Sequence, residues 1–138
     1  MNAPLYTTEV LRLASSLAGP RTLGDADGRS ELRSPTCGST IVTEVILDGD
    51  GRVATLSQEV RACAFGQASA ALVEQAAPGR SAAEVEQALG ELTDWLGGRR
   101  DVPGAWPGLE ALSPARSKAG RHGAILLPFR ALLEAMKP

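Results

Sequence analysis

Three side chains of the sequence are of the kind that binds soft or borderline metals. They are Cys37, Cys63 and His122, the only two cysteines and the only histidine of the 138 residues. Thiolate sulfur and neutral imidazole nitrogen are ligands of zinc and of iron. The spacing between them is wide, and no C-x-x-C pair fixes a site by itself. The residue types leave two interpretations open: one shared metal site, or two buried thiols and a surface imidazole.

Each of these three residues lies at the end of a predicted element. Cys37 falls in a loop bounded by proline and glycine, Cys63 follows a predicted strand and precedes an alanine-rich helix, and His122 comes just before the last helix. A ligand at the end of an element can reach out of the core, and the positive end of a helix favours the thiolate that binds metal. We therefore expect the three side chains to meet at one surface end of the fold.

Four helices are predicted from apolar residues at helical spacing, over residues 7–18, 64–77, 81–96 and 123–136. Ser81 and Glu84 have the spacing of a capping box at the start of the third helix. In the last helix, Pro128 is expected within the first turns, where backbone N–H groups have no intrahelical partner. This arrangement places His122 at the helix start.

A β-hairpin is predicted over residues 40–60, because β-branched residues alternate there around an Asp-Gly-Asp-Gly turn. A short strand is expected at residues 31–33, after a loop rich in glycine and aspartate over residues 21–30. Strands that come early and helices that come late indicate the α+β fold class, with helices covering a small antiparallel three-stranded sheet. The length and the 43% hydrophobic content fit a single domain over residues 1–138.

The charge pattern excludes some classes of partner. The net charge is −2, and no cluster of lysine and arginine is interleaved with aromatic residues, so nucleic acid is not expected as a partner. The N-terminal residues show no basic region followed by an apolar run, and no stretch of about 18 apolar residues occurs, so no membrane association is expected. We expect a soluble cytoplasmic protein, in which two thiols stay reduced rather than form a disulfide framework.

Three short segments occur in a recognisable order: S-P-T-C-G at residues 34–38, C-A-F-G-Q-A-S-A at 63–70 and R-H-G-A-I-L at 121–126. The first resembles N-P-x-C-G and the second resembles G-C-x-x-x-x-A-S-A-S. The third resembles a segment with a basic residue or histidine, then cysteine, then an apolar helix. These are motifs of the NifU N-terminal, IscU and SufU family of iron–sulfur cluster assembly scaffolds. The resemblance covers about residues 5–136 and implies the fold of that family.

The resemblance also implies a ligand set. In the family, three cysteines hold a nascent [2Fe–2S] cluster or a zinc ion, assisted by an aspartate two residues after the first cysteine and sometimes by a histidine beside the third. Cys37 and Cys63 match the first two cysteines and His122 matches the histidine, whereas Gly123 replaces the third cysteine and Ser39 replaces the aspartate. The implied ligands of zinc, iron or a [2Fe–2S] cluster are therefore Cys37, Cys63 and His122, with the Ser39 hydroxyl as an auxiliary.

The function implied by the resemblance is that of a scaffold, not an enzyme, with a cysteine desulfurase and iron–sulfur acceptor proteins as partners. Two alternatives stay open. The chain could be an interaction or regulatory module that has lost the cluster, which the glycine at position 123 favours. It could also be a small zinc hydrolase, but that chemistry needs a general base within hydrogen-bond reach, and Glu44 and Glu59 are expected to be solvated residues of the sheet.

Overall fold

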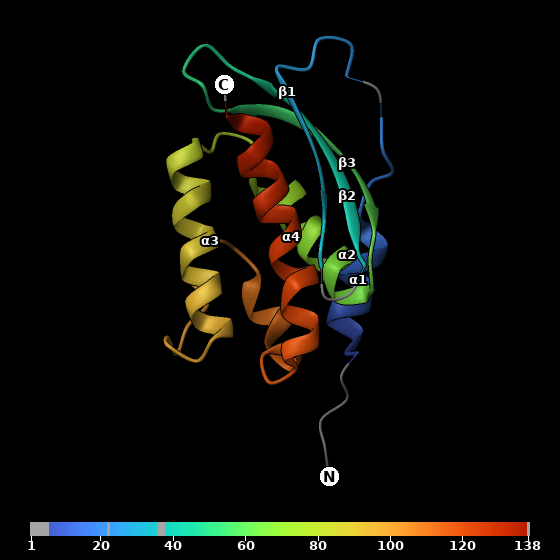
Figure 1. Cartoon of the computed structure of the whole chain (residues 1–138), viewed down its shortest axis with the longest axis vertical. Coiled ribbons are helices and arrows are strands. Elements are labelled where there is room, and N and C mark those ends of the chain that lie inside the picture. The colour runs from blue at the N-terminus through green and yellow to red at the C-terminus, as the bar shows by residue number, and fades with distance from the viewer. Residues whose placement is uncertain (1–5, 22, 36–37, 138) are drawn as a thin grey trace.

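The computed structural model describes residues 6–21, 23–35 and 38–137. Figure 1 shows a sheet with helices packed against one side. Among the described residues, no helix combines the length and the apolar character that crossing a membrane requires. The elements follow one another as α1 (Thr8–Ser16), β1 (Gly28–Arg33), β2 (Thr40–Leu47), β3 (Val53–Arg61), α2 (Ala64–Ala76), α3 (Ala82–Leu96), the 3-10 helix η1 (Leu109–Ala115) and α4 (Ala119–Met136).

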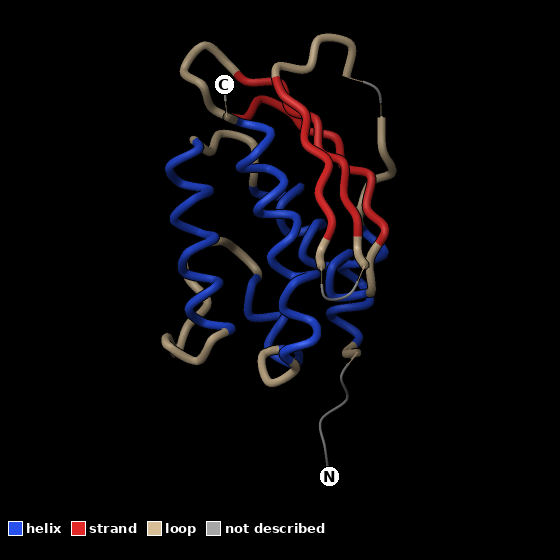
Figure 2. Tube along the Cα trace, viewed as in Figure 1, coloured by secondary structure: helices blue, strands red, loops and turns tan. Residues whose placement is uncertain are grey.

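The three strands form one antiparallel sheet in the order β1-β2-β3. Helices α2 and α4 pack on its inner face, and no described helix covers its outer face (Figure 2). Alternation along β2 turns Ile41, Thr43 and Val45 inward, where each is at most 1% exposed. The predicted α+β class, with helices on a small antiparallel sheet, is therefore confirmed, as is the hairpin.

Local sequence signals fix the ends of helix α3. The Ser81 hydroxyl accepts a hydrogen bond from the backbone N–H of Glu84, and the Glu84 carboxylate accepts one from the backbone N–H of Ser81, which is the predicted capping box. The Ser81 N–H and the guanidinium of Arg52 together lower the pKa of the Glu84 carboxyl group. At the other end, Gly97 and Gly98 terminate the helix, also as predicted.

Strand β1 begins at Gly28, three residues before the predicted start, so the expectation of a loop over residues 28–30 is wrong. Glycine and serine have low strand propensity, but contacts with α4 override it here. The Ser30 hydroxyl donates to the carbonyl oxygen of Ala131 at 2.7 Å. A Cβ built on Gly28 would collide with the carbonyl oxygen of Ala135, so only glycine allows this approach.

Helix α4 begins at Ala119, four residues before the predicted start. His122 consequently lies in its first turn, but Pro128 lies in its middle, and the expectation that Pro128 falls in the first turns is wrong. Proline has no N–H to donate to the carbonyl group of Ala124, which normally ends or bends a helix. Here the helix continues because its central turns are buried between the sheet and α2, so that tertiary packing outweighs the lost hydrogen bond.

We predict that Gly28→Ala lowers the free energy of unfolding by about 3 kcal/mol, because the added methyl group must displace the backbone of α4. Gly24→Ala is the matched control, since no atom lies within 4 Å of its added Cβ, and it should change stability by less than about 0.5 kcal/mol. Urea unfolding followed by circular dichroism measures both. Equal stability of the two variants would show that β1 and α4 are not in this close contact.

The apolar core predicts that the fold does not depend on metal. Its buried residues form a cluster that joins all four α-helices and the sheet. Chelator-treated protein should therefore keep its far-ultraviolet circular dichroism and a cooperative melt, unlike structural zinc domains, which unfold without metal. Loss of the cooperative melt after removal of metal would contradict this prediction.

Candidate metal and cluster site

One end of the sheet gathers the segments that carry the predicted ligands. The loop between β1 and β2 is closed by the N–H of Ser34, which donates to the carbonyl of Ser39 at 2.8 Å, and by the N–H of Gly38, which donates to the carbonyl of Ser34 at 3.1 Å. Thr40, at the exit of this loop, pairs with Arg61 at the end of β3. The described residue at the exit of this loop therefore lies beside the turn that leads from β3 into α2.

Helix α4 runs antiparallel to β1 and brings its first turn to the same end of the sheet. Gly28 meets Ala135, Ser30 meets Ala131, and Leu32 packs against the cluster that contains Leu127. Two residues of a strand span about 6.6 Å and four residues of a helix span about 6 Å. Every second residue of β1 therefore lies level with every fourth residue of α4. One further step places Ser34 level with residue 123 of α4.

Helix α2 approaches the same turn of α4 from the other side. A Cβ built on Gly66 would lie 3.3 Å from the Cβ of Ala124, and the Ser69 hydroxyl donates to the carbonyl of Ile125 at 2.6 Å. Because Gly66 belongs to the first turn of α2, the start of this helix lies against the residue that follows Gly123. The predicted ligand Cys63 directly precedes this turn.

Cys63 is the N-cap residue of α2, as the sequence predicted for a thiol at a helix N-terminus. Its side chain is half-buried and makes no capping hydrogen bond. The corner is held by Gln67 instead, whose side-chain amide donates to the carbonyl of Ala62 at 3.0 Å and whose backbone N–H donates to the carbonyl of Cys63 at 2.9 Å. These contacts fix the backbone on both sides of the sulfur without engaging the sulfur itself.

His122 has a fixed ring orientation. Its Nε2 lies 3.1 Å from the carbonyl oxygen of Ala115 and 2.9 Å from that of Arg116. A carbonyl oxygen can only accept, so Nε2 carries the hydrogen, and in the neutral ring Nδ1 keeps its lone pair. Histidine ligands of metals commonly donate their other N–H to a backbone carbonyl in this way. Nδ1 is therefore the ring nitrogen that could bind a metal or cluster.

The carbonyl groups that orient His122 are themselves anchored. The Nε atom of Arg116 donates to the carbonyl of Trp95 at 2.8 Å, and its guanidinium lies over the Trp95 ring at 5.5 Å from the centroid. The connection between η1 and α4 is thereby tied to the end of α3. The sequence could not have indicated this contact, because Arg116 has no local pattern that distinguishes it from a surface arginine.

Of the other two predicted ligands, the structure describes Ser39 but not Cys37. Cys37 lies outside the described residues, and Ser39 is buried, with 5% of its surface exposed. Among residues 6–21, 23–35 and 38–137, no three histidine, cysteine or acidic side chains form a group that could hold a metal. The described segments on either side of Cys37 adjoin those that carry Cys63 and His122, but the convergence of the three side chains stays a prediction.

Gly66 and Gln67 also position Cys63, and neither role was predicted from the sequence. A glycine inside a predicted helix often marks a close approach to another backbone, and this signal could have identified Gly66. Gln67 carries no such signal, because its role depends on the carbonyl of Ala62 at the preceding corner.

The carboxylates considered as a general base lie on another surface. Glu44 and Glu59 alternate with the inward residues of their strands and therefore project from the outer face of the sheet, on the side away from the helices. Glu59 pairs there with Arg61 at 3.6 Å. Neither position supports the hydrolase alternative.

Comparison with known proteins agrees with this architecture. No protein-family model matches the chain, and no curated protein matches it significantly. Among solved structures, a nitrogen-fixing NifU-like protein (N-terminal) from Brucella abortus superposes with a TM-score of 0.88 and 27% identity, over 95% of this chain and 91% of that chain.

A second structure is that of a protein from the thermophilic Fervidobacterium islandicum, assigned as an iron–sulfur cluster assembly scaffold protein for the SUF system. It has a TM-score of 0.78 and 19% identity, over 96% of this chain and 97% of that chain. The fold is thus that of the NifU N-terminal and SufU-type scaffold proteins. The likeness to the NifU, IscU and SufU scaffolds that the three sequence segments predicted is therefore confirmed at the level of the structure.

We predict that Gly123→Cys lets the protein hold a [2Fe–2S] cluster after anaerobic reconstitution with iron and sulfide. Gly123 lies inside α4 and is not among the glycines with positive φ, so cysteine suits the backbone and has a helix propensity better by about 0.3 kcal/mol. The third thiolate supplies a ligand that such clusters favour. Visible absorption and labile sulfide measure the result.

Gly90→Cys is the control for this experiment, because it adds a thiol to α3 where no atom lies within 4 Å of the new Cβ. It should hold no more cluster than the wild type. A wild-type chain that already holds a full and stable cluster, or a folded Gly123→Cys variant that gains none, contradicts this account of position 123.

Proposed function

We propose that the protein is a scaffold-like component of cytoplasmic iron–sulfur cluster assembly that binds zinc, iron or a nascent cluster as cargo through Cys37, Cys63 and His122. The observation that carries the proposal is the packing of α4 against β1 and α2. It sets the first turn of α4, the start of α2 and the end of β1 at one end of the sheet. The likeness to scaffold proteins over nearly the whole chain supports it.

The chemistry of the donor set fits this cargo. Two thiolates and one imidazole nitrogen suit tetrahedral zinc and also iron, and a water molecule or a partner's thiolate would complete four ligands. The N–H of His122 that faces two carbonyl groups leaves Nδ1 as its donor atom. Ser39 stands where the family has an aspartate and offers a neutral hydroxyl oxygen at most, so we include it only as an auxiliary ligand.

The proposed partners are a cysteine desulfurase, as the source of sulfur, and acceptor proteins that receive the cluster. Because Gly123 takes the place of the third cysteine, the chain lacks the thiol that accepts sulfur in the family. Sulfur would therefore have to reach Cys37 or Cys63. The same glycine favours one alternative function, an interaction module that binds a desulfurase or an acceptor but carries no cluster.

Metal content decides between these two functions. We predict that protein purified without oxygen contains zinc or iron, and that cobalt(II) added to the metal-free chain gives thiolate-to-metal charge-transfer absorption. Three variants, Cys37→Ser, Cys63→Ser and His122→Gln, should each weaken cobalt binding by more than about tenfold. Loss of a group that only orients a metal ligand already weakens binding by about tenfold, and loss of the ligand itself should weaken it more. Glu86→Gln, an exposed change on α3, should leave it unaltered.

Each result has a defined meaning. Binding that falls in all three ligand variants and persists in Glu86→Gln supports the scaffold proposal. A chain that binds no cobalt, zinc or iron, or that binds equally well without either thiol, overturns it. In that event a desulfurase that still forms a complex with the metal-free chain would favour the interaction module.

A further inference from the structure

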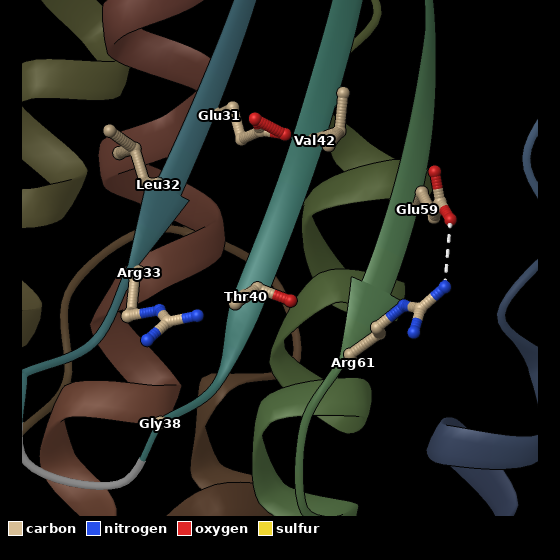
Figure 3. A pocket seen from close by; sticks show the side chains of 8 residues that line it. All are labelled: Glu31, Leu32, Arg33, Gly38, Thr40, Val42, Glu59 and Arg61. Carbon is tan, nitrogen blue, oxygen red and sulfur yellow. Dashed lines mark ion pairs between the residues drawn. The ribbon is translucent and has the colours of Figure 1, made fainter.

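The outer face of the sheet carries charges in two parallel rows. The strand register places residues of like charge at the same level on the two edge strands, β1 and β3. Arginines occupy one level near the end of the sheet, and glutamates occupy the next outward-facing level, two residues further along each strand. These residues line a shallow hollow, which Figure 3 views from outside. The arginine row is Arg33, Thr40 and Arg61, and the glutamate row is Glu31, Val42 and Glu59.

The charges of both rows are accessible to a partner. Glu31 and Arg33 are exposed and, within the part of the chain that the structure describes, form no ion pair. Arg61 and Glu59 pair at 3.6 Å, but their side chains remain 79% and 49% exposed. Such an exposed pair contributes little to stability, so it can exchange for contacts to another surface.

We propose that this face is a self-association surface, on which a second copy of the chain stacks through a two-fold axis that runs across the strands between the two rows. In that arrangement the arginine row of each copy lies over the glutamate row of the other. Arg33 then faces Glu31 of the other copy and Arg61 faces Glu59, and each contact occurs twice, as two-fold symmetry requires. The proposal does not depend on the function proposed above.

Symmetry and charge select this orientation. A two-fold axis along the strands would instead set Arg33 over Arg61 and Glu31 over Glu59, so that like charges oppose each other. The axis across the strands keeps the strands of the two sheets aligned, which is a usual geometry for stacked sheets. The central residues of the rows then bring Val42 of one copy over Thr40 of the other.

A second copy is the occupant that the charge pattern identifies. A partner that fits this face must present charges of opposite sign at successive outward-facing positions of a strand. The chain presents this pattern itself, with Arg29, Glu31 and Arg33 on β1 and with Glu59 and Arg61 on β3. Successive residues on one face of a strand lie about 6.6 Å apart, which matches the separation of the rows.

The surface is small, and this limits the strength of the association. At the far end of the sheet the segment before β1 covers the outer face, where the backbone N–H of Arg21 donates to the Ser57 hydroxyl at 2.9 Å. The open part is therefore mostly the two charged rows. Contacts of this size and polarity are typical of weak complexes, and their strength falls as salt screens the charges.

Reciprocal charge reversal tests the proposal. Glu31→Arg/Glu59→Arg makes both rows positive, and Arg33→Glu/Arg61→Glu makes both rows negative. Sedimentation equilibrium over a concentration series should show that the wild type self-associates, with an affinity at least about tenfold weaker in 0.5 M than in 0.05 M salt. Each variant alone should be monomeric, and an equimolar mixture of the two should again associate.

The controls separate a specific surface from general attraction between oppositely charged chains. Glu86→Arg/Glu110→Arg and Arg12→Glu/Arg130→Glu change the net charge by the same amounts at exposed positions away from the outer face. Each should self-associate as the wild type does, and circular dichroism should show that all four variants are folded. A wild type that is monomeric throughout, a folded face variant that still self-associates, or a mixture of face variants that does not associate overturns the proposal.

Discussion

The close packing of α4 along β1 is the constraint on which the rest of the structure depends. It requires a glycine at position 28, where a side chain would collide with the carbonyl of Ala135, and it holds a proline in the middle of a buried helix. Ser30 ties the same two elements together through the carbonyl of Ala131. With this register fixed, the first turn of α4 has only one place to lie, which is the end of the sheet beside the loop that follows β1.

The candidate site is built by that register rather than by neighbouring residues in the sequence. Helix α2 completes it, since Gly66 and Ser69 bring the helix that starts after Cys63 against the same turn of α4. The family resemblance implied the candidate ligands, and the packing brings the helix start after Cys63 close to the turn of α4 that carries His122. Gly123 has an ordinary helical backbone conformation, so α4 forms with glycine at that position.

Local signals predicted the elements whose ends depend on local chemistry. The capping box of Ser81 and Glu84, the alternation of β2 and the N-terminal position of Cys63 before α2 are all confirmed. The predicted starts of β1 and α4 were wrong, because the true starts depend on contacts between elements that are distant in the sequence. The ring orientation of His122 could not be predicted from the sequence either, because it is set by two carbonyl groups at the end of η1.

X-ray absorption of the zinc-loaded chain tests the central claim most directly, because it counts the sulfur and nitrogen neighbours of the metal. The account predicts two sulfur ligands at about 2.3 Å and one imidazole nitrogen at about 2.0 Å, with the sulfur count reduced to one in Cys63→Ser. A zinc ion surrounded only by oxygen and nitrogen, or a sulfur count that does not change in Cys63→Ser, would contradict it.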